Sequence, residues 1–251
     1  MDTRGKILQQ LIHVGELLLT NGAEVKRVEE TIVRMGRAYG ASETDVFAIT
    51  SSIVVTITFP DGETLTQTKR IRSSGDTDFT KIEELNALSR RCCAQPLSLE
   101  ELTAEIKRIR DFRQGSLYFY CGSMLAAGSL AMFFGGNAAD GVLAALVAVL
   151  ICAMQKRLAP LCMNNVIFNL IVSFVTGTII CLLAGFLPVH VDKIMIGDIM
   201  LLIPGLALTN AVRNVLIGDT ISGIMRLIES LLWAGALACG FMGAVLMTGV
   251  W

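Results

Sequence analysis

Long stretches of this 251-residue chain contain no charged side chain. Three of them cover residues 114–139, 158–191 and 230–251. Each exceeds the roughly 20 apolar residues that cross the hydrocarbon core of a bilayer. A helix at the surface of a soluble domain carries charged and polar residues on its solvent-facing side. These stretches therefore exclude a wholly soluble protein and predict membrane helices in the C-terminal part of the chain.

The chain also lacks the patterns of several functional classes. Its formal net charge of −1 gives no basic face for nucleic acid. It has no Walker A loop, no GxGxxG after a strand, no HExxH and no GxSxG, so we expect neither an enzyme nor a bound cofactor. The seven cysteines show no CxxC pair and no histidine at metal-ligand spacing, so we expect no metal site. Polar residues interrupt the first apolar segment, 7–19, which excludes a secretory signal peptide.

Most of the charged residues lie in the first 113 residues, whose pattern is that of a folded domain. Apolar residues recur at helical spacing in four segments, which are 7–19, 25–39, 79–93 and 99–112. The last of these opens with the capping box Ser98-x-x-Glu101. Between them, β-branched or alternating residues predict strands at 46–50, 52–59 and 63–70, with a turn at Pro60-Asp61-Gly62. We therefore expect residues 1–113 to form an α+β domain with a three-strand meander.

Residues 114–251 are expected to form an all-α polytopic membrane domain. Hydropathy predicts five transmembrane helices, at about 116–134, 141–155, 166–187, 194–212 and 221–250. Basic residues gather on one side of these spans: four in 107–113, Lys156-Arg157 and Arg213, against Lys193 on the other side. Because cytoplasmic loops carry the excess of Lys and Arg, we expect a multi-pass protein of the bacterial cytoplasmic (inner) membrane. Its N-terminal domain would be cytoplasmic and its C-terminal Trp251 outside.

Two ridges of small residues mark the last predicted span. Ala236, Gly240 and Ala244 form one, and Gly235, Cys239 and Gly243 form the other. Small residues at four-residue spacing let membrane helices approach closely. These ridges suit either packing within the chain or contact with another subunit in a higher oligomer, and the sequence favours neither.

The segment between 194 and 229 combines a helix breaker with charges at membrane depth. Pro204-Gly205 interrupts an apolar helix. Broken helices build the substrate sites of many transporters, although a structural kink is equally compatible with the pattern. Charged residues follow, and Asp219, Ser222, Arg226, Glu229 and Ser230 share one helical face. We expect Arg226 to pair with Glu229, and Arg213 with Asp219, because buried charges need partners.

These charges have two interpretations. They clamp the last two spans together at the cytoplasmic surface, or their spare arginine charge holds the carboxylate of a substrate, which a guanidinium binds through two hydrogen bonds. Ionisable residues at membrane depth usually mark a substrate or ion path. Under the second interpretation, this charged stripe, the helical face with Asp219, Arg226 and Glu229, is the candidate site.

Two segments resemble the threonine/serine exporter (ThrE) family. One is Leu18-Leu-x-Asn-Gly-Ala-Glu-Val-x-Arg-Val-Glu29, and the other is Ile203-Pro-Gly-Leu-Ala-Leu-Thr-Asn-Ala-Val-Arg-Asn214 with the charged stripe after it. The resemblance covers nearly the whole chain. It implies export of small amino acids or of dicarboxylates such as succinate. The length resembles the split form of the family, whose large YjjP-like subunit works with a small YjjB-like membrane partner.

The sequence and the resemblance together predict a subunit of a secondary exporter of small carboxylate metabolites. The expected substrate and ion pathway consists of Pro204, Gly205, Asn210, Arg213, Asp219, Arg226 and Glu229. Asp219 and Glu229 are the candidate proton carriers, because a carboxylate loses its charge on protonation. Two alternatives stay open: a membrane-anchored receptor or scaffold, and a hydrolase, each with its activity in the soluble domain.

Overall fold

The computed structural model describes residues 3–71, 77–113, 115–162 and 164–249, in two compact units. Unit 1 comprises Met1–Arg113 with Leu206–Leu227, and unit 2 comprises Gln114–Gly205 with Ile228–Trp251. The expected division into 1–113 and 114–251 stays a prediction. The units differ from it in one respect, since residues 206–227, expected in the membrane domain, pack with the N-terminal segment.

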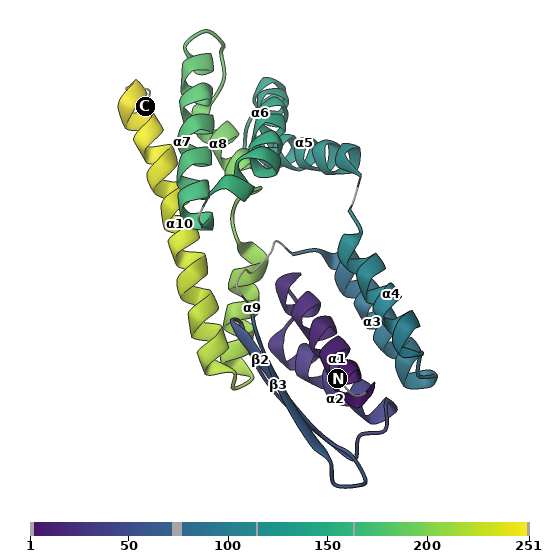
Figure 1. Cartoon of the computed structure of the whole chain (residues 1–251). Coiled ribbons are helices and arrows are strands. Elements are labelled where there is room, and N and C mark those ends of the chain that lie inside the picture. Colours follow the sequence, from purple (N-terminus) through teal and green to yellow (C-terminus); the bar gives the residue numbers. More distant parts are fainter. Residues whose placement is uncertain (1–2, 72–76, 114, 163, 250–251) are drawn as a thin grey trace. The chain divides into compact units, whose positions relative to one another are not determined.

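Unit 1 contains a three-strand sheet and six helical segments among its described residues (Figure 1). Its helices are α1 (Thr3–Thr20), α2 (Val25–Ala38), α3 (Phe79–Ala94), α4 (Leu99–Asp111), α9 (Gly205–Leu216, from Leu206 on) and the first part of α10 (Thr220–Thr248). Its strands are β1 (Glu43–Ile49), β2 (Ser52–Thr58) and β3 (Thr64–Arg70). The predicted helices and the three-strand meander are present, and Ser98 and Glu101 form the predicted capping box at α4.

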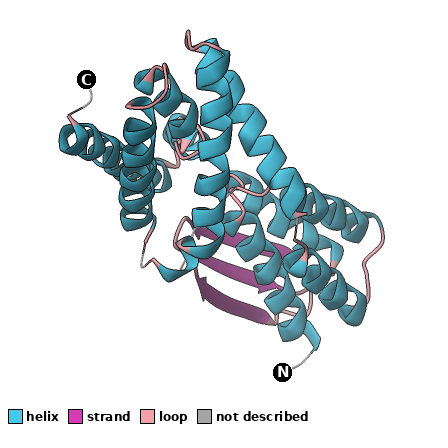
Figure 2. Cartoon of the chain, turned by 90° about the horizontal axis from the view of Figure 1, so that it is seen from above, coloured by secondary structure: helices cyan, strands magenta, loops and turns pink. Residues whose placement is uncertain are grey.

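The sheet is antiparallel in the order β1-β2-β3, and its three strands lie side by side in Figure 2. Residues alternate along β2, so Ile53, Val55 and Ile57 are buried on one face. These side chains join the core that α1 and α2 supply, which includes Leu11, Leu18 and Ile32. The opposite face is polar, with a hydroxyl–hydroxyl contact of 2.9 Å between Thr56 and Thr66. The alternation seen in the sequence therefore sets which face of the sheet packs on the helices.

The regular secondary structure of unit 2 is helical throughout its described residues. It contains α5 (Ser116–Phe133), α6 (Ala138–Arg157), the short 3-10 helix η1 (Ala159–Leu161), α7 (Asn165–Ala184), α8 (Val191–Ile199) and α10 from Ile228 on. Four helical segments are long and apolar enough to cross a membrane: Ser116–Phe133, Ala138–Leu161, Asn165–Ala184 and Thr220–Thr248. The chain therefore contains both a small three-strand sheet and several helices that are apolar enough to cross a membrane.

The predicted count of five spans is not confirmed, because the expected fourth span at 194–212 is not one helix. Helix α8 ends at Ile199 after nine residues, and α9 begins at Gly205. Pro204 has no N–H to continue a helical ladder, and it biases the residue before it away from helical geometry. The interruption therefore extends over residues 200–204 rather than kinking a continuous helix.

Small residues bring the helices of unit 2 close together. A Cβ on Gly128 of α5 would lie 2.8 Å from the carbonyl oxygen of Gly141 in α6. A Cβ on Gly240 of α10 would overlap the hydroxyl of Ser173 in α7. The ridge of Ala236, Gly240 and Ala244 is buried, so it packs within the chain. On the second ridge, a Cβ added to Gly235 would meet no described atom within 4 Å.

Candidate functional site

The two sequence segments that resemble the exporter family meet within unit 1. Arg213 of α9 forms an ion pair with Glu24, at 2.5 Å between the guanidinium and the carboxylate. The amide of Asn210, one turn earlier on α9, points at the carbonyl oxygen of Gly22 from 3.5 Å. These contacts attach α9 to the turn between α1 and α2. Two residues of α9 thus contact residues that lie 188 and 189 positions earlier in the chain, and together they form one candidate site.

The turn between α1 and α2 is shaped to present these acceptors. Gly22 has a φ of +90°, which a side chain would disfavour, and it lets the chain reverse directly after α1. Asn21 fixes the turn, because its amide donates to the carbonyl of Leu17 at 2.6 Å. Glu24 follows at the N-cap position of α2, yet its side chain makes no capping hydrogen bond. Its carboxylate is therefore available to Arg213.

A second carboxylate, Glu29, lies further along α2. It accepts a hydrogen bond from the backbone N–H of Ala48 at 2.9 Å. Partial burial raises the pKa of Glu29, the bond from Ala48 opposes that rise, and the nearby carboxylate of Asp219 adds to it. Asp219 therefore lies near Glu29, and the ion-pair partner of Arg213 is Glu24 instead of the expected Asp219.

Helix α9 and the start of α10 form a hairpin (Figure 1), and three of its polar residues are buried. Asn214 on α9 and Ser222 and Arg226 on α10 are all buried. Gly223 allows the close approach, since a Cβ there would lie 2.8 Å from the backbone nitrogen of Val215. The side-chain oxygen of Asn214 has no hydrogen-bond partner among the described residues. Buried polar side chains on a closely packed hairpin are compatible with a segment that binds a polar solute.

The expected pathway residues are only partly brought together. Asn210, Arg213, Asp219 and Arg226 lie in unit 1, whereas Pro204, Gly205 and Glu229 belong to unit 2. Glu229 is exposed. The expected pair of Arg226 with Glu229 stays a prediction.

The sequence analysis did not include four residues of interest, Glu24, Glu29, Asn214 and Asp198, in the site. Glu24 and Glu29 belong to the first family-like segment and Asn214 to the second, which is the signal that would have pointed to them. Asp198, on α8 in unit 2, is completely buried. Only its position just before the Pro204 break distinguished it in the sequence.

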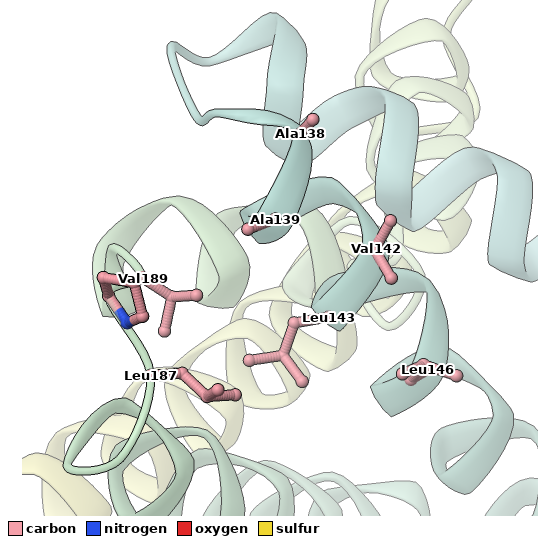
Figure 3. Close-up of a pocket in the computed structure, with 8 residues that line it drawn as sticks. Ala138, Ala139, Val142, Leu143, Leu146, Leu187 and Val189 are labelled. Carbon is pink, nitrogen blue, oxygen red and sulfur yellow. The ribbon is translucent and has the colours of Figure 1, made fainter.

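Unit 2 also has an apolar hollow, which Figure 3 shows between α6 and the connection from α7 to α8. Its volume is about 440 Å³, and its lining consists of alanine, valine, leucine and proline side chains, among them Val142, Leu146 and Leu187. A carboxylate placed there would find no side-chain donor. The hollow therefore does not fit the expected substrate, and it suits an apolar chain.

Comparison with known proteins gives consistent matches over nearly the whole chain. The model of the threonine/serine exporter family, ThrE, matches residues 9–248. The chain is 27% identical to "Probable succinate transporter subunit YjjP" of Klebsiella aerogenes over 93% of its own length and 90% of that protein. It is 26% identical to the protein of the same name in Escherichia coli, over 95% and 93% of the two chains.

A longer relative matches as well. The chain is 22% identical to "Threonine/serine exporter" of Corynebacterium glutamicum over 93% of its own length, and it spans 50% of that protein. No solved structure matches.

Proposed function

Because the chain belongs to the threonine/serine exporter family, we propose that it exports small carboxylate metabolites by secondary transport. The family and the relatives make it a membrane exporter subunit and not an enzyme. The relatives' names give succinate for one and threonine and serine for another. All three compounds present a carboxylate, so one guanidinium-based site suits each of them.

The ion pair between Arg213 and Glu24 is the observation that supports this proposal. Arg213 is 59% exposed at its side chain, so a solute can reach its guanidinium. Glu24 occupies that guanidinium with a carboxylate, which is the same group that the substrate would offer. In the proposed cycle the substrate carboxylate replaces Glu24 on Arg213, so binding releases the turn between α1 and α2 from α9.

The other pathway residues take supporting roles in the proposed site. Asn210 and Asp219 flank Arg213 on the α9–α10 hairpin, and Arg226 supplies a second, buried guanidinium. Pro204 and Gly205 set the start of α9, and the N-terminal end of a half-helix favours anions. Glu229 stays a candidate further along α10.

We further propose that α8 and α9 together make one discontinuous membrane crossing. The chain leaves unit 2 at Gly205, enters unit 1 with α9, and returns to unit 2 along α10. With the three preceding spans and α10, this path gives an odd number of crossings. The basic residues at 107–113 and 156–157 then face the cytoplasm, with the N-terminal domain inside and the C-terminus outside. Trp251, which the sequence analysis places outside the membrane, lies beyond the residues that the structure describes.

A second membrane subunit is part of the proposal. The YjjP relatives carry the word "subunit" in their names, and this chain spans only half of the Corynebacterium glutamicum exporter. The missing half of the exporter is proposed to be a small YjjB-like membrane protein. Purification from the native host in mild detergent should recover such a partner with this chain.

Efflux from proteoliposomes that contain both subunits tests the proposed function. Labelled succinate, threonine and serine are loaded inside, and Arg213→Ala is expected to lose most of the efflux of the true substrate. Arg91→Ala is the matched control, because Arg91 pairs with Glu105 at 2.9 Å and is 55% exposed. Each substitution removes one exposed ion pair worth about 0–1 kcal/mol, so both variants should fold. Equal efflux from the two variants would contradict the role of Arg213.

A further inference from the structure

Asp198 is a buried acid without a partner among the described residues. It lies on α8 in unit 2 with no exposed surface, and neither of its carboxylate oxygens has a hydrogen-bond partner there. One turn before it and one turn after it are Ile194 and Leu202, which are buried and apolar. Buried polar side chains are nearly always hydrogen-bonded, so this side chain needs an explanation.

Asp140 shows what a structural acid looks like in the same unit. It is also completely buried, but it accepts from the backbone N–H groups of Asn137 and His190, each at 2.7 Å. The ring of His190 lies 2.9 Å from it as well. Asp140 thus caps α6 and ties it to the start of α8, whereas Asp198 makes no comparable contact.

The helices packed against α8 supply no charge to Asp198. Helix α8 contacts α5, α6 and α7, and its neighbouring Gly197 fits against the carbonyl of Ala127 in α5. The titratable and charged groups on these four helices are Tyr118, Tyr120, Cys121, Asp140, Cys152, Lys156, Arg157, Cys181, Asp192 and Lys193. Within the described part of the chain, neither a hydrogen bond nor an ion pair joins any of them to Asp198.

Two basic groups on α8 and the helices packed against it, Lys193 and Lys156, are engaged elsewhere. Lys193 pairs with Asp192 at 3.0 Å. The ammonium of Lys156 lies over the ring of Tyr120, 4.4 Å from its centre. Asp198 therefore faces an apolar environment in which no described cation balances an ionised carboxylate.

We propose that Asp198 carries the coupling proton of the transport cycle, an inference that rests on the proposed function as a secondary exporter. In this cycle the carboxyl group is neutral while it is buried and has no partner among the described residues. It takes one proton from water on the outer side and returns it to water on the inner side, while the metabolite moves outward. The proton binds a carboxylate oxygen and leaves from it again, with no redox change.

Two physical terms favour the neutral form in this place. An ionised carboxylate in apolar surroundings loses its hydration without compensation. Asp198 is also next to the last residue of α8, where the partial negative charge at a helix C-terminus repels an anion. Protonation removes both penalties. The group can therefore be buried when protonated and must reach water to release its proton.

The position of Asp198 offers a way to reach water. Its backbone carbonyl accepts the N–H of Leu201 at 3.1 Å, and the chain is not helical again until Gly205. Because residues 200–204 lack the continuous backbone hydrogen bonds of a helix, this segment can rearrange with little loss of hydrogen bonds. Release of the proton would thus be coupled to movement of the 200–204 break, and through it to α9 and Arg213.

Infrared difference spectroscopy tests the protonation state without any substrate. The full chain with its native partner is titrated in lipid nanodiscs, and the C=O stretch of a neutral carboxylic acid is followed against pH. The wild type is expected to show a band that Asp198→Asn lacks. Asp192→Asn is the control, since Asp192 lies on the same helix with 65% of its side chain exposed, and it should keep the band. A band that survives in Asp198→Asn would overturn the proposal.

Transport assays test the coupling itself. In Asp198→Asn, a pH gradient should no longer drive export against a substrate gradient, while exchange of labelled for unlabelled substrate at equal pH continues. Asn resembles the neutral acid in shape, and Asp198→Glu, which keeps the carboxyl, should recover part of the driven export. Gradient-driven export by Asp198→Asn, or loss of both driven export and exchange, would overturn the inference. If the wild type exports nothing, the proposed function fails, and the infrared experiment still decides the protonation of Asp198.

Discussion

Substitution of Gly223 by alanine probes the contact on which the candidate site depends. A Cβ at this position of α10 would lie 2.6 Å from a methyl of Val215, 2.8 Å from the Val215 nitrogen and 2.9 Å from the carbonyl oxygen of Ala211. Two of these atoms belong to the backbone of α9, so no side-chain rotation relieves the overlap. The two helices must separate, and overpacking of this kind costs about 1–3 kcal/mol.

Gly235→Ala is the matched control on the same helix. A Cβ at Gly235 meets no described atom within 4 Å. Both variants add one methyl group to α10 and gain the preference of alanine over glycine in a helix, about 1 kcal/mol. Their difference therefore isolates the contact at Gly223. We expect Gly223→Ala to be less stable than Gly235→Ala by about 1–3 kcal/mol.

Thermal unfolding of the full chain in mild detergent measures this difference. For a chain of this size, each kcal/mol shifts the melting temperature by roughly 2–4 °C. Gly223→Ala should also lower efflux in the reconstituted exporter, because separating the helices displaces α9, which carries Arg213, from its place in the candidate site. If the two variants melt together and export equally, the close contact of α9 with α10 is refuted.

Two further substitutions test packing and charge. Gly240→Ala should melt well below Gly235→Ala because its methyl group overlaps the Ser173 hydroxyl, and Ser173→Ala in the same chain should restore part of the loss; no difference between the two glycine variants would contradict the packing. Partial burial raises the pKa of Glu29 above its ordinary value. Glu29 therefore stabilises the fold most when the pH is below its ordinary pKa, and this contribution falls as the pH rises through the raised pKa of the folded state. Glu29→Gln, which still accepts from Ala48, should therefore gain melting temperature relative to the wild type as pH rises above the ordinary glutamate pKa of about 4.3, and a difference that stays constant with pH would contradict this.

The described residues of 1–113 in unit 1 could be predicted well because their signals are local. Helical spacing, a capping box and a turn at Pro60-Asp61-Gly62 each act over a few residues. The strand expected at 52–59 is observed as Ser52–Thr58, and the box at Ser98 is present. Local signals also set the face of the sheet that is buried, since alternation along β2 determines it.

The membrane part was predicted less well because hydropathy reports composition and not continuity. Residues 194–212 are apolar enough for a span, yet α8 stops at Ile199. Pro204 marked a break in the sequence, but its extent depends on how 200–203 pack. The same limit applies to span counts in general: a window average cannot distinguish one helix from two short ones.

The ion pair at the candidate site had no signal in residue spacing. Arg213 was assigned to Asp219 because the two are close in sequence, whereas its partner Glu24 is 189 positions away. Spacing on one helix predicts only neighbours on that helix. The two family-like segments did contain both partners. Recognition of those segments therefore pointed to the candidate site, although it did not predict the pairing of Arg213 with Glu24.

The choice of a proton carrier illustrates why solvent exposure has to be added to spacing. Asp219 and Glu229 stood out in the sequence because they share a stripe with Arg226, yet Glu229 is exposed and Asp219 is only partly buried. A carboxylate in water changes its protonation with little effect on the fold around it. Asp198 has no exposed surface and no partner among the described residues, so its ionisation must be accompanied by a change in its surroundings. That requirement is what couples a proton to a conformational step, and it favours Asp198 as the carrier.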